Sequence, residues 1–249
     1  KLWNAARFAE MNGVFRDWNY DPVAARVTVN RWIAGETSRT RDVVTRAIEE
    51  HKYSEAAGAL YQFVWNVFCD WYLELSKVVL NDPKASAAAQ RGTRRTLVQV
   101  LESLLRLLHP ITPFITAELW ERVAPVAGRK DAGGVAGIVN AAYPQAQLQR
   151  IDTAADAWVA QLKAVVGACR NLRSELNLSP AQRAPMFAIG DAGFVDQAAP
   201  LLKALARLSD VQHFADDAAF AQATALAPVA VQGNVRLALH VEIDVAAEH

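Results

Sequence analysis

The residues best suited to chemistry are arginines that stand beside aromatic residues near the start of the chain. Three such groups occur within the first 32 residues: Arg7-Phe8, Arg16-Asp17-Trp18 and Asn30-Arg31-Trp32. Single-stranded nucleic acid is held by this mixture, because cations contact phosphates and aromatic faces stack on unpaired bases. The same residues also suit a plainer structure, with the rings in the core and the arginines in solvent. The pattern alone leaves both possibilities open.

Charge along the chain limits where a polyanion could bind. The 249 residues include 26 Lys and Arg and 26 Asp and Glu, so a strongly basic nucleic-acid-packaging protein is excluded. Residues 84–106 hold five basic residues and one acidic residue, whereas residues 191–249 hold three basic and eight acidic residues. A polyanionic partner should therefore meet the first half of the chain or the start of the second half.

Catalytic and metal-binding patterns are missing from the sequence. None of the five histidines forms an HExxH motif or has zinc-site spacing with Cys69 and Cys169, and no GxSxG, kinase or P-loop motif occurs. The sequence therefore predicts no catalytic residue, no metal site and no cofactor in this chain. We expect both cysteines to be buried free thiols. The absence of a leader at KLWNAARF and of any long apolar run favours a cytoplasmic protein without membrane contact.

Hydrophobic periodicity predicts a helical first part. Helices are expected over residues 1–18, 24–51, 53–80, 84–108 and 112–125, with a turn over 19–23. Thr112 and Pro113 provide the start signal of the last helix. In the third helix, four aromatic residues are expected in the core: Trp65, Phe68, Trp71 and Tyr72. In the fourth helix, a solvated face is expected for Arg95, Gln99, Glu102 and Arg106.

The second part changes character after a glycine-containing segment. Residues 126–150 lack helical period and predict a linker with one short strand. A helix over 152–177, a strand over 185–189, a helix over 193–208 and a strand over 211–214 follow. A hairpin of 229–231 and 235–245 turns at Gly233-Asn234. No Rossmann-like βαβ pattern is evident. The predicted fold is mainly α: a helical bundle over 1–125, a linker over 126–150 and a small α+β domain over 151–249.

Four segments together resemble one protein family. They are KLWNAARF at the start, FVWNVFCDWYLELSK over 63–77, LLHPITPFITAELWERV over 107–123 and RNLRSELNLSP over 170–180. This set closely resembles the part of valyl-tRNA synthetases, which are class I aminoacyl-tRNA synthetases, that follows the catalytic domain. The FCDWYLELSK block is the most specific element, whereas the block over 107–123 is shared more loosely with the isoleucyl and leucyl enzymes.

The resemblance implies a helical-bundle anticodon-binding domain, followed by a small α+β domain and then a coiled coil. The chain shows no long heptad helix after that domain, and the motifs His-Ile-Gly-His and Lys-Met-Ser-Lys-Ser are absent. It therefore resembles a fragment of a valine–tRNA ligase that lacks the catalytic motifs. The longer enzyme would use ATP with Mg to charge valine tRNA, would edit threonine mischarges and would be monomeric. The partner implied is tRNA, with no DNA.

By resemblance, the first two helices of the bundle should meet the anticodon. Arg7 would contact a phosphate or a base edge, and Trp32 would provide a stacking face, with Asn4 and Arg31 as second choices. Core packing of Trp32 and a structural ion pair of Arg7 are the alternatives. Arg170 and Arg173 would contact the tRNA backbone or dock the two domains together. The same module of an isoleucyl enzyme, or a helical protein-interaction scaffold without RNA binding, also remains open.

Overall fold

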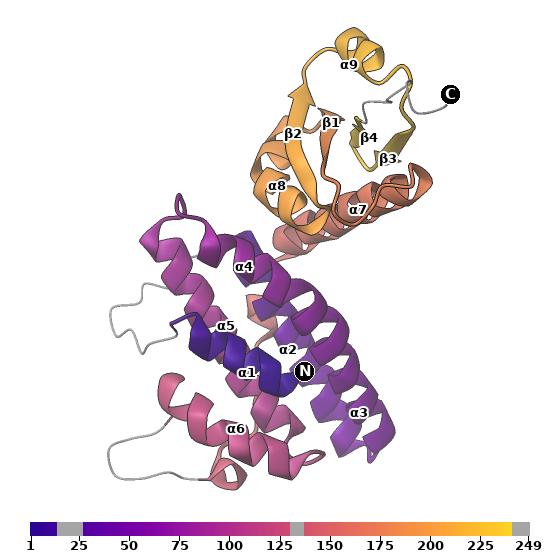
Figure 1. Cartoon of the computed structure of the whole chain (residues 1–249). Helices are drawn as coiled ribbons and strands as arrows, with labels where there is room; N and C mark the ends of the chain where they lie inside the picture. Colours follow the sequence, from indigo (N-terminus) through magenta and orange to yellow (C-terminus); the bar gives the residue numbers. More distant parts are fainter. Residues whose placement is uncertain (14–26, 130–136, 241–249) are drawn as a thin grey trace. The chain divides into compact units, whose positions relative to one another are not determined.

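The computed structural model describes residues 1–13, 27–129 and 137–240, and the chain forms two compact units, Lys1–Ala155 and Asp156–His249. The first unit is a bundle of helices (Figure 1). Its principal elements are α1 (Leu2–Met11), α2 (Thr28–Glu49), α3 (Tyr53–Gln62), the π-helical segment η1 (Phe63–Tyr72), α4 (Leu73–Asn81), α5 (Ala87–Leu108) and α6 (Pro113–Val126). The predicted helical bundle is confirmed. The turn predicted over 19–23 lies outside the described residues.

The predicted third helix is one rod made of α3, η1 and α4, and its middle is π-helical rather than α-helical. Phe63, Phe68 and Tyr72, spaced five and four residues apart, are all buried on one side of the wider π turns. Trp65 instead lies at the surface, where its side chain is 36% exposed and stacks on Tyr61 at 5.2 Å between ring centroids. The prediction that Trp65 belongs to the core is therefore wrong.

α5 and α6 begin where local capping signals stand. The Ser86 hydroxyl oxygen accepts a hydrogen bond from the Ala89 amide at the start of α5. Pro113 occupies the first turn of α6, as predicted, but the Thr112 hydroxyl donates back to Leu108 O and makes no side-chain cap. α6 also runs through Pro125 to Val126, one residue beyond the predicted end.

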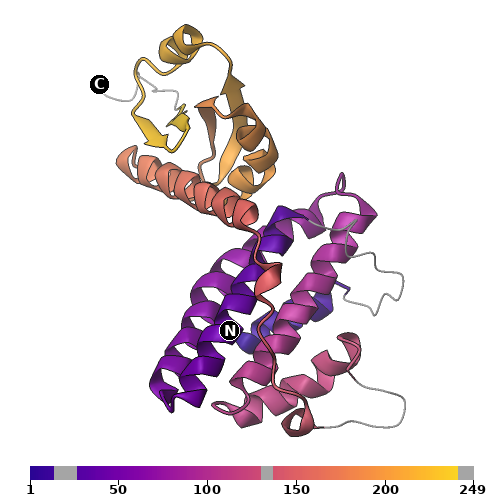
Figure 2. The same cartoon turned by 180° about the vertical axis from the view of Figure 1, so that it is seen from behind.

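The described part of the predicted linker packs along the first unit. Residues 137–150 form two 3₁₀ turns, η2 (Ile138–Asn140) and η3 (Leu148–Arg150), and contain no strand. This segment runs beside α2 and α5 (Figure 2). The Gln147 amide donates to Ser38 Oγ at 2.7 Å, and the Tyr143 hydroxyl donates to Leu107 O at 3.4 Å. The compact units divide after Ala155, so 137–150 belongs to the first unit.

The second unit is a four-stranded sheet with three helices. Its elements are α7 (Thr153–Glu175), β1 (Ala184–Gly190), α8 (Ala192–Leu205), β2 (Leu208–Phe214), α9 (Asp217–Ala223), β3 (Val229–Gln232) and β4 (Val235–Leu239). The strand order is β2-β1-β4-β3, with β1 and β2 parallel and the other pairs antiparallel. The small α+β part is confirmed. The strand, helix and strand predicted over 185–214 form one βαβ unit, β1–α8–β2. α9 was not predicted.

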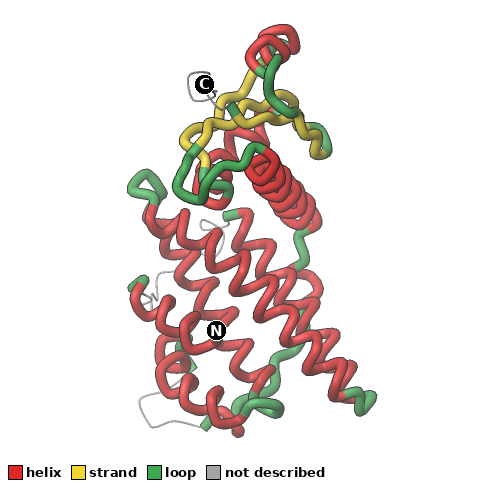
Figure 3. Tube along the Cα trace, turned by 45° about the vertical axis from the view of Figure 1, so that its right-hand side comes forward, coloured by secondary structure: helices red, strands yellow, loops and turns green. Residues whose placement is uncertain are grey.

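Successive side chains of β1 point to opposite faces of the sheet. Met186 is fully buried on the face covered by α7 and α8, where its sulfur lies 3.5 Å from Cys169 Sγ. Phe187 points to the other face and contacts Phe214, which packs on Phe220 of α9. Figure 3 shows α7 and α8 on one side of the sheet and α9 on the other. The sheet thereby forms the centre of a core separate from that of the bundle.

The end of β1 requires glycine. Gly190 has a φ of +124°, and a Cβ there would lie 1.9 Å from Asn234 O in the β3–β4 turn. Any other residue would collide with this turn, so the glycine lets the hairpin close against β1.

Candidate nucleic-acid interface

α1 has one face against the bundle and one face in solvent. Ala5, Ala6 and Ala9 are buried, and these small residues let α1 approach α5 and α6 closely. Trp3, Asn4, Arg7, Glu10 and Met11 lie on the exposed face. Their spacing of one, three and four residues is that of a single helical face. α1 therefore presents a cation, an amide and an aromatic ring together to solvent.

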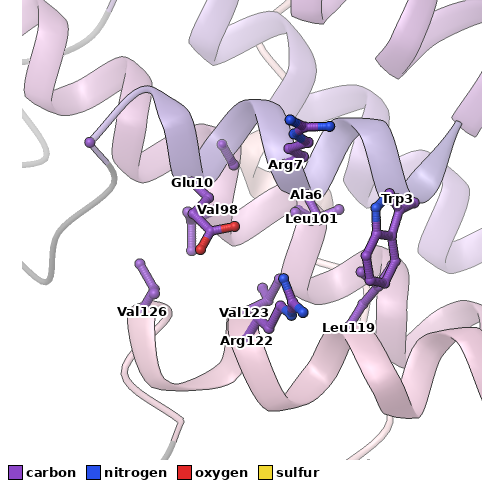
Figure 4. Close-up of a pocket in the computed structure, with 12 residues that line it drawn as sticks. Trp3, Ala6, Arg7, Glu10, Val98, Leu101, Leu119, Arg122, Val123 and Val126 are labelled. Atoms are coloured by element: carbon purple, nitrogen blue, oxygen red, sulfur yellow. The ribbon is translucent and has the colours of Figure 1, made fainter.

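A pocket of about 510 Å³ lies between α1, α5 and α6. Trp3 and Glu10 of α1 face Arg122 of α6 across it (Figure 4). The Arg122 guanidinium carbon lies 5.1 Å from the centroid of the Trp3 ring, within the range of a cation–π contact. Leu101 and Leu119 form the apolar floor. The pocket combines an aromatic ring, two arginines, the Glu10 carboxylate and apolar surface. The ring and the arginines suit a nucleotide base with its phosphate.

Arg7 and Asn4 are available for a ligand. Both side chains are exposed, and neither forms a hydrogen bond or an ion pair with another described residue. The alternative of a structural ion pair for Arg7 is therefore not observed within the described residues. A guanidinium without a protein partner keeps all its donors free for a phosphate or a guanine edge.

Trp32 and Arg31 have structural roles instead. Trp32 is only 4% exposed, so its ring has no free face on which a base could stack. The expectation of a stacking face at Trp32 is thus wrong, and the alternative of core packing is right. Arg31 Nη1 lies 3.2 Å from Asp152 Oδ2 in an ion pair that connects α2 to the segment before α7. Asp152 also accepts a hydrogen bond from the Ala155 amide at the start of α7.

Arg173 is an internal clamp of the second unit. Its side chain is buried, and its guanidinium donates to Ser179 O at 2.9 Å, Gln182 O at 2.8 Å and Arg207 O at 3.4 Å. These bonds join the end of α7 to the loops before β1 and β2. The Arg173 guanidinium is thus engaged by backbone carbonyls, and its contact with tRNA backbone stays a prediction. Arg170 is exposed and donates to Leu205 O at 3.3 Å.

Sequence reasoning missed Trp3 and Arg122. A signal for Trp3 was present, because Trp3 and Arg7 are four residues apart and share a helical face. Nothing local pairs Arg122 with Trp3, since α6 meets α1 only through the fold. The described residues contain no group of three or more potential metal ligands and no helix long and apolar enough to span a membrane.

Comparison with known proteins identifies the family to which the chain belongs. Residues 30–188 match the family model described as the anticodon-binding domain of tRNA ligase. The whole chain is 45% identical over 259 residues to the valine–tRNA ligase of Dechloromonas aromatica, and 43% identical over 254 residues to that of Laribacter hongkongensis. The valine–tRNA ligase of Caulobacter vibrioides is 43% identical over 255 residues. The chain spans 26%, 26% and 27% of the length of these relatives. The chain therefore belongs to the family of anticodon-binding domains of tRNA ligases.

Proposed function

We propose that this chain is the anticodon-binding module of a valine–tRNA ligase and that valine tRNA is its partner. The valine–tRNA ligases that are 43–45% identical to the whole chain support this assignment over an isoleucyl enzyme. The longer ligase would activate valine with ATP and Mg, charge the tRNA and edit threonine mischarges. It would act in the cytoplasm as a monomer. Those reactions belong to other parts of the ligase, because this sequence lacks His-Ile-Gly-His and Lys-Met-Ser-Lys-Ser.

The observation that carries the proposal is the exposed face of α1. Arg7 has no partner among the described residues, and Asn4 and Trp3 stand within one helical turn of it. In this proposal Arg7 contacts a phosphate or base edge of the anticodon, Asn4 hydrogen-bonds to a base, and the Trp3 ring stacks on a base. Trp3 replaces Trp32 as the aromatic platform, because the Trp32 ring is buried.

Binding of tRNA transcripts tests this proposal. Fluorescence anisotropy should show tighter binding of a valine tRNA transcript than of the same transcript with its anticodon replaced or of an isoleucine tRNA transcript. Arg7→Ala should weaken valine tRNA binding by roughly 5- to 150-fold, which corresponds to about 1–3 kcal/mol for a base-edge contact. Arg46→Ala is the matched control, because Arg46 is an exposed arginine of α2 whose ion pair is with Asp42 in the same helix.

Two results would contradict the proposal. Equal affinity for valine tRNA transcripts with the original and with a replaced anticodon would contradict the anticodon-binding role. Binding that barely changes with salt would instead favour a protein-interaction scaffold, because nucleic-acid binding weakens steeply as salt rises.

A further inference from the structure

The first unit has a second cleft, which we name the arginine cleft. It has a volume of about 470 Å³ and is lined by five arginines: Arg41, Arg95, Arg106, Arg129 and Arg150. They come from α2, α5, the segment after α6 and η3, so residues more than 100 positions apart in the sequence share one cleft. Glu102 is the only carboxylate that lines the cleft among the described residues.

Glu102 is already occupied by two of the arginines. Its side chain is 3% exposed, and Arg106 donates to it at 2.8 Å while Arg129 Nε donates at 3.1 Å. The predicted solvated face of α5 is therefore half wrong, because Glu102 and Arg106 are buried. One carboxylate neutralises one positive charge, so the cleft keeps a large excess of positive charge.

The other three arginines have no acidic partner among the described residues. Arg41 donates to Ser103 Oγ and, at 3.3 Å, to Gln145 O, both of which are neutral acceptors. The side chains of Arg95 and Arg150 form no hydrogen bond or ion pair with a described residue. Three guanidinium groups thus line one cleft without an ion pair to a described carboxylate, although the nearby charge of Glu102 partly offsets that of Arg41.

The electrostatic cost of this arrangement is visible at Arg41. Burial, followed by the nearby positive charges of Arg106 and Arg150, lowers the pKa of Arg41 to about 10. The group stays charged at neutral pH, so the repulsion is present in the folded protein under ordinary conditions. An anion seated among these guanidinium groups would offset both the burial and the repulsion.

We propose that the arginine cleft binds phosphate groups of the tRNA backbone, as a contact separate from the anticodon contact at α1. Guanidinium groups match phosphate oxygens with paired hydrogen bonds, so five arginines beside a single carboxylate favour phosphate over other ligands. The inference rests on the proposed function, which supplies a polyanionic partner. The cleft is open to solvent at Arg129, whose side chain is 53% exposed.

α5 lies between the two contact regions. Val98 and Leu101 of α5 line the pocket beside α1, whereas Arg95 and Gln99 of the same helix line the arginine cleft. The two regions therefore lie on neighbouring faces of one helix within one unit. A single tRNA can contact both, with base recognition at α1 and backbone phosphates in the arginine cleft.

The test uses the double variant Arg95→Gln/Arg150→Gln in the full chain. Neither side chain forms a hydrogen bond or an ion pair with a described residue, so the thermal midpoint should change little. The control is Arg46→Gln/Lys52→Gln, which removes the same charge from exposed positions that do not line the cleft. Affinity for the valine tRNA transcript is measured over a series of salt concentrations, with the original and with a replaced anticodon.

Loss of two phosphate contacts should make the log–log salt slope shallower by about 1.4 to 1.8, since each contact contributes about 0.7 for a single strand and about 0.9 for a B-form duplex. Affinity at 0.1 M salt should fall by roughly tenfold per contact on the same basis. The factor should be equal for both anticodons, because a backbone contact does not depend on sequence. The control variant should retain the slope and affinity of the original protein.

The possible results distinguish failure of the cleft proposal from failure of the proposed function. An unchanged salt slope in Arg95→Gln/Arg150→Gln would contradict phosphate binding in the arginine cleft. The proposed function would still be supported in that case if the original protein discriminates between the two anticodons. A changed slope without any anticodon discrimination overturns the proposed function and leaves the phosphate contact standing. A loss of affinity that occurs only with the original valine anticodon would also contradict the cleft proposal, because it would indicate that the two arginines contact bases rather than backbone phosphates. If the double variant unfolds, Arg150→Gln alone provides the same comparison with an expected slope change of about 0.7 to 0.9.

Discussion

The Tyr72 hydroxyl donates a 2.9 Å hydrogen bond to Asn30 Oδ1, which joins the π-helical segment η1 to α2 inside the first unit. Asn30 Nδ2 donates in turn to Thr93 Oγ1 of α5 at 3.0 Å, and the Thr93 hydroxyl donates to Ala89 O. All three side chains are buried. A buried polar network whose members are satisfied fixes how its helices lie against one another, because any shift would leave a polar group unpaired.

Tyr72→Phe should lower the free energy of unfolding by about 1–3 kcal/mol, because it leaves Asn30 Oδ1 buried without this donor. Urea unfolding followed by circular dichroism measures the change. Tyr61→Phe is the control, since Tyr61 is 55% exposed and its change should be within about 0.5 kcal/mol. Equal effects of the two substitutions would show that the network does not stabilise the bundle.

Trp32→Ala should destabilise the first unit by about 3–5 kcal/mol, because it removes a buried ring and leaves a cavity. Trp3→Ala should cost less, since Trp3 is 41% exposed. The expected effects of the two substitutions on tRNA binding are the reverse. Trp3→Ala should weaken valine tRNA binding by about 1–3 kcal/mol, the contribution of a ring that stacks on a base. A stable Trp32→Ala variant with weakened tRNA binding would restore the stacking role of Trp32.

Arg173→Met should destabilise the second unit by about 1.5–3 kcal/mol, because carbonyl groups of two loops lose a charged donor. Arg170→Met is the matched control on the same helix, as Arg170 is exposed. Hydrogen exchange should show the loss of protection around residues 179–182 and 207–208. A variant with unchanged exchange there would contradict the clamp role of Arg173.

Burial raises the pKa of the Cys169 thiol to about 12, from an ordinary value of 9. The thiolate is therefore scarce at pH 8, and iodoacetamide should label Cys169 only after unfolding. The half-buried Cys69, whose pKa burial also raises, should react first. Mass spectrometry of native and denatured protein checks the order, and native labelling of Cys169 at the rate of Cys69 would contradict it.

The same pKa shift makes stability depend on pH with a definite sign. The folded state prefers the protonated thiol, so the contribution of Cys169 to the free energy of unfolding is fully present below about pH 9. It is lost as pH rises from about 9 towards 12, because the unfolded state releases its proton first. Cys169→Val should lack this part of the decline. Comparing the two proteins by urea unfolding between pH 8 and 11 isolates it from other titrating groups.

Most of the helices and strands follow from local signals in the sequence. Leucines spaced three and four residues apart in α5, Pro113 in the first turn of α6 and Gly233-Asn234 between β3 and β4 are local signals, and each element formed where its signal stood. Such signals act through backbone geometry and hydrophobic period within one segment. The π-helical turns of η1 and the pairing of β1 with β2 are decided by packing between segments, which no local pattern specifies.

Which arginines and tryptophans are exposed to a ligand depends on the packing of the helices. Trp3 and Trp32 both stand near an arginine in the sequence, yet α1 leaves Trp3 at the surface and α2 buries Trp32. Arg173 and Arg7 both lie in helices, yet the carbonyls that hold Arg173 come from loops up to 34 positions away. A side chain binds a ligand only if its neighbours in space leave its donors or its ring face unoccupied, and those neighbours are set by the fold rather than by adjacent residues.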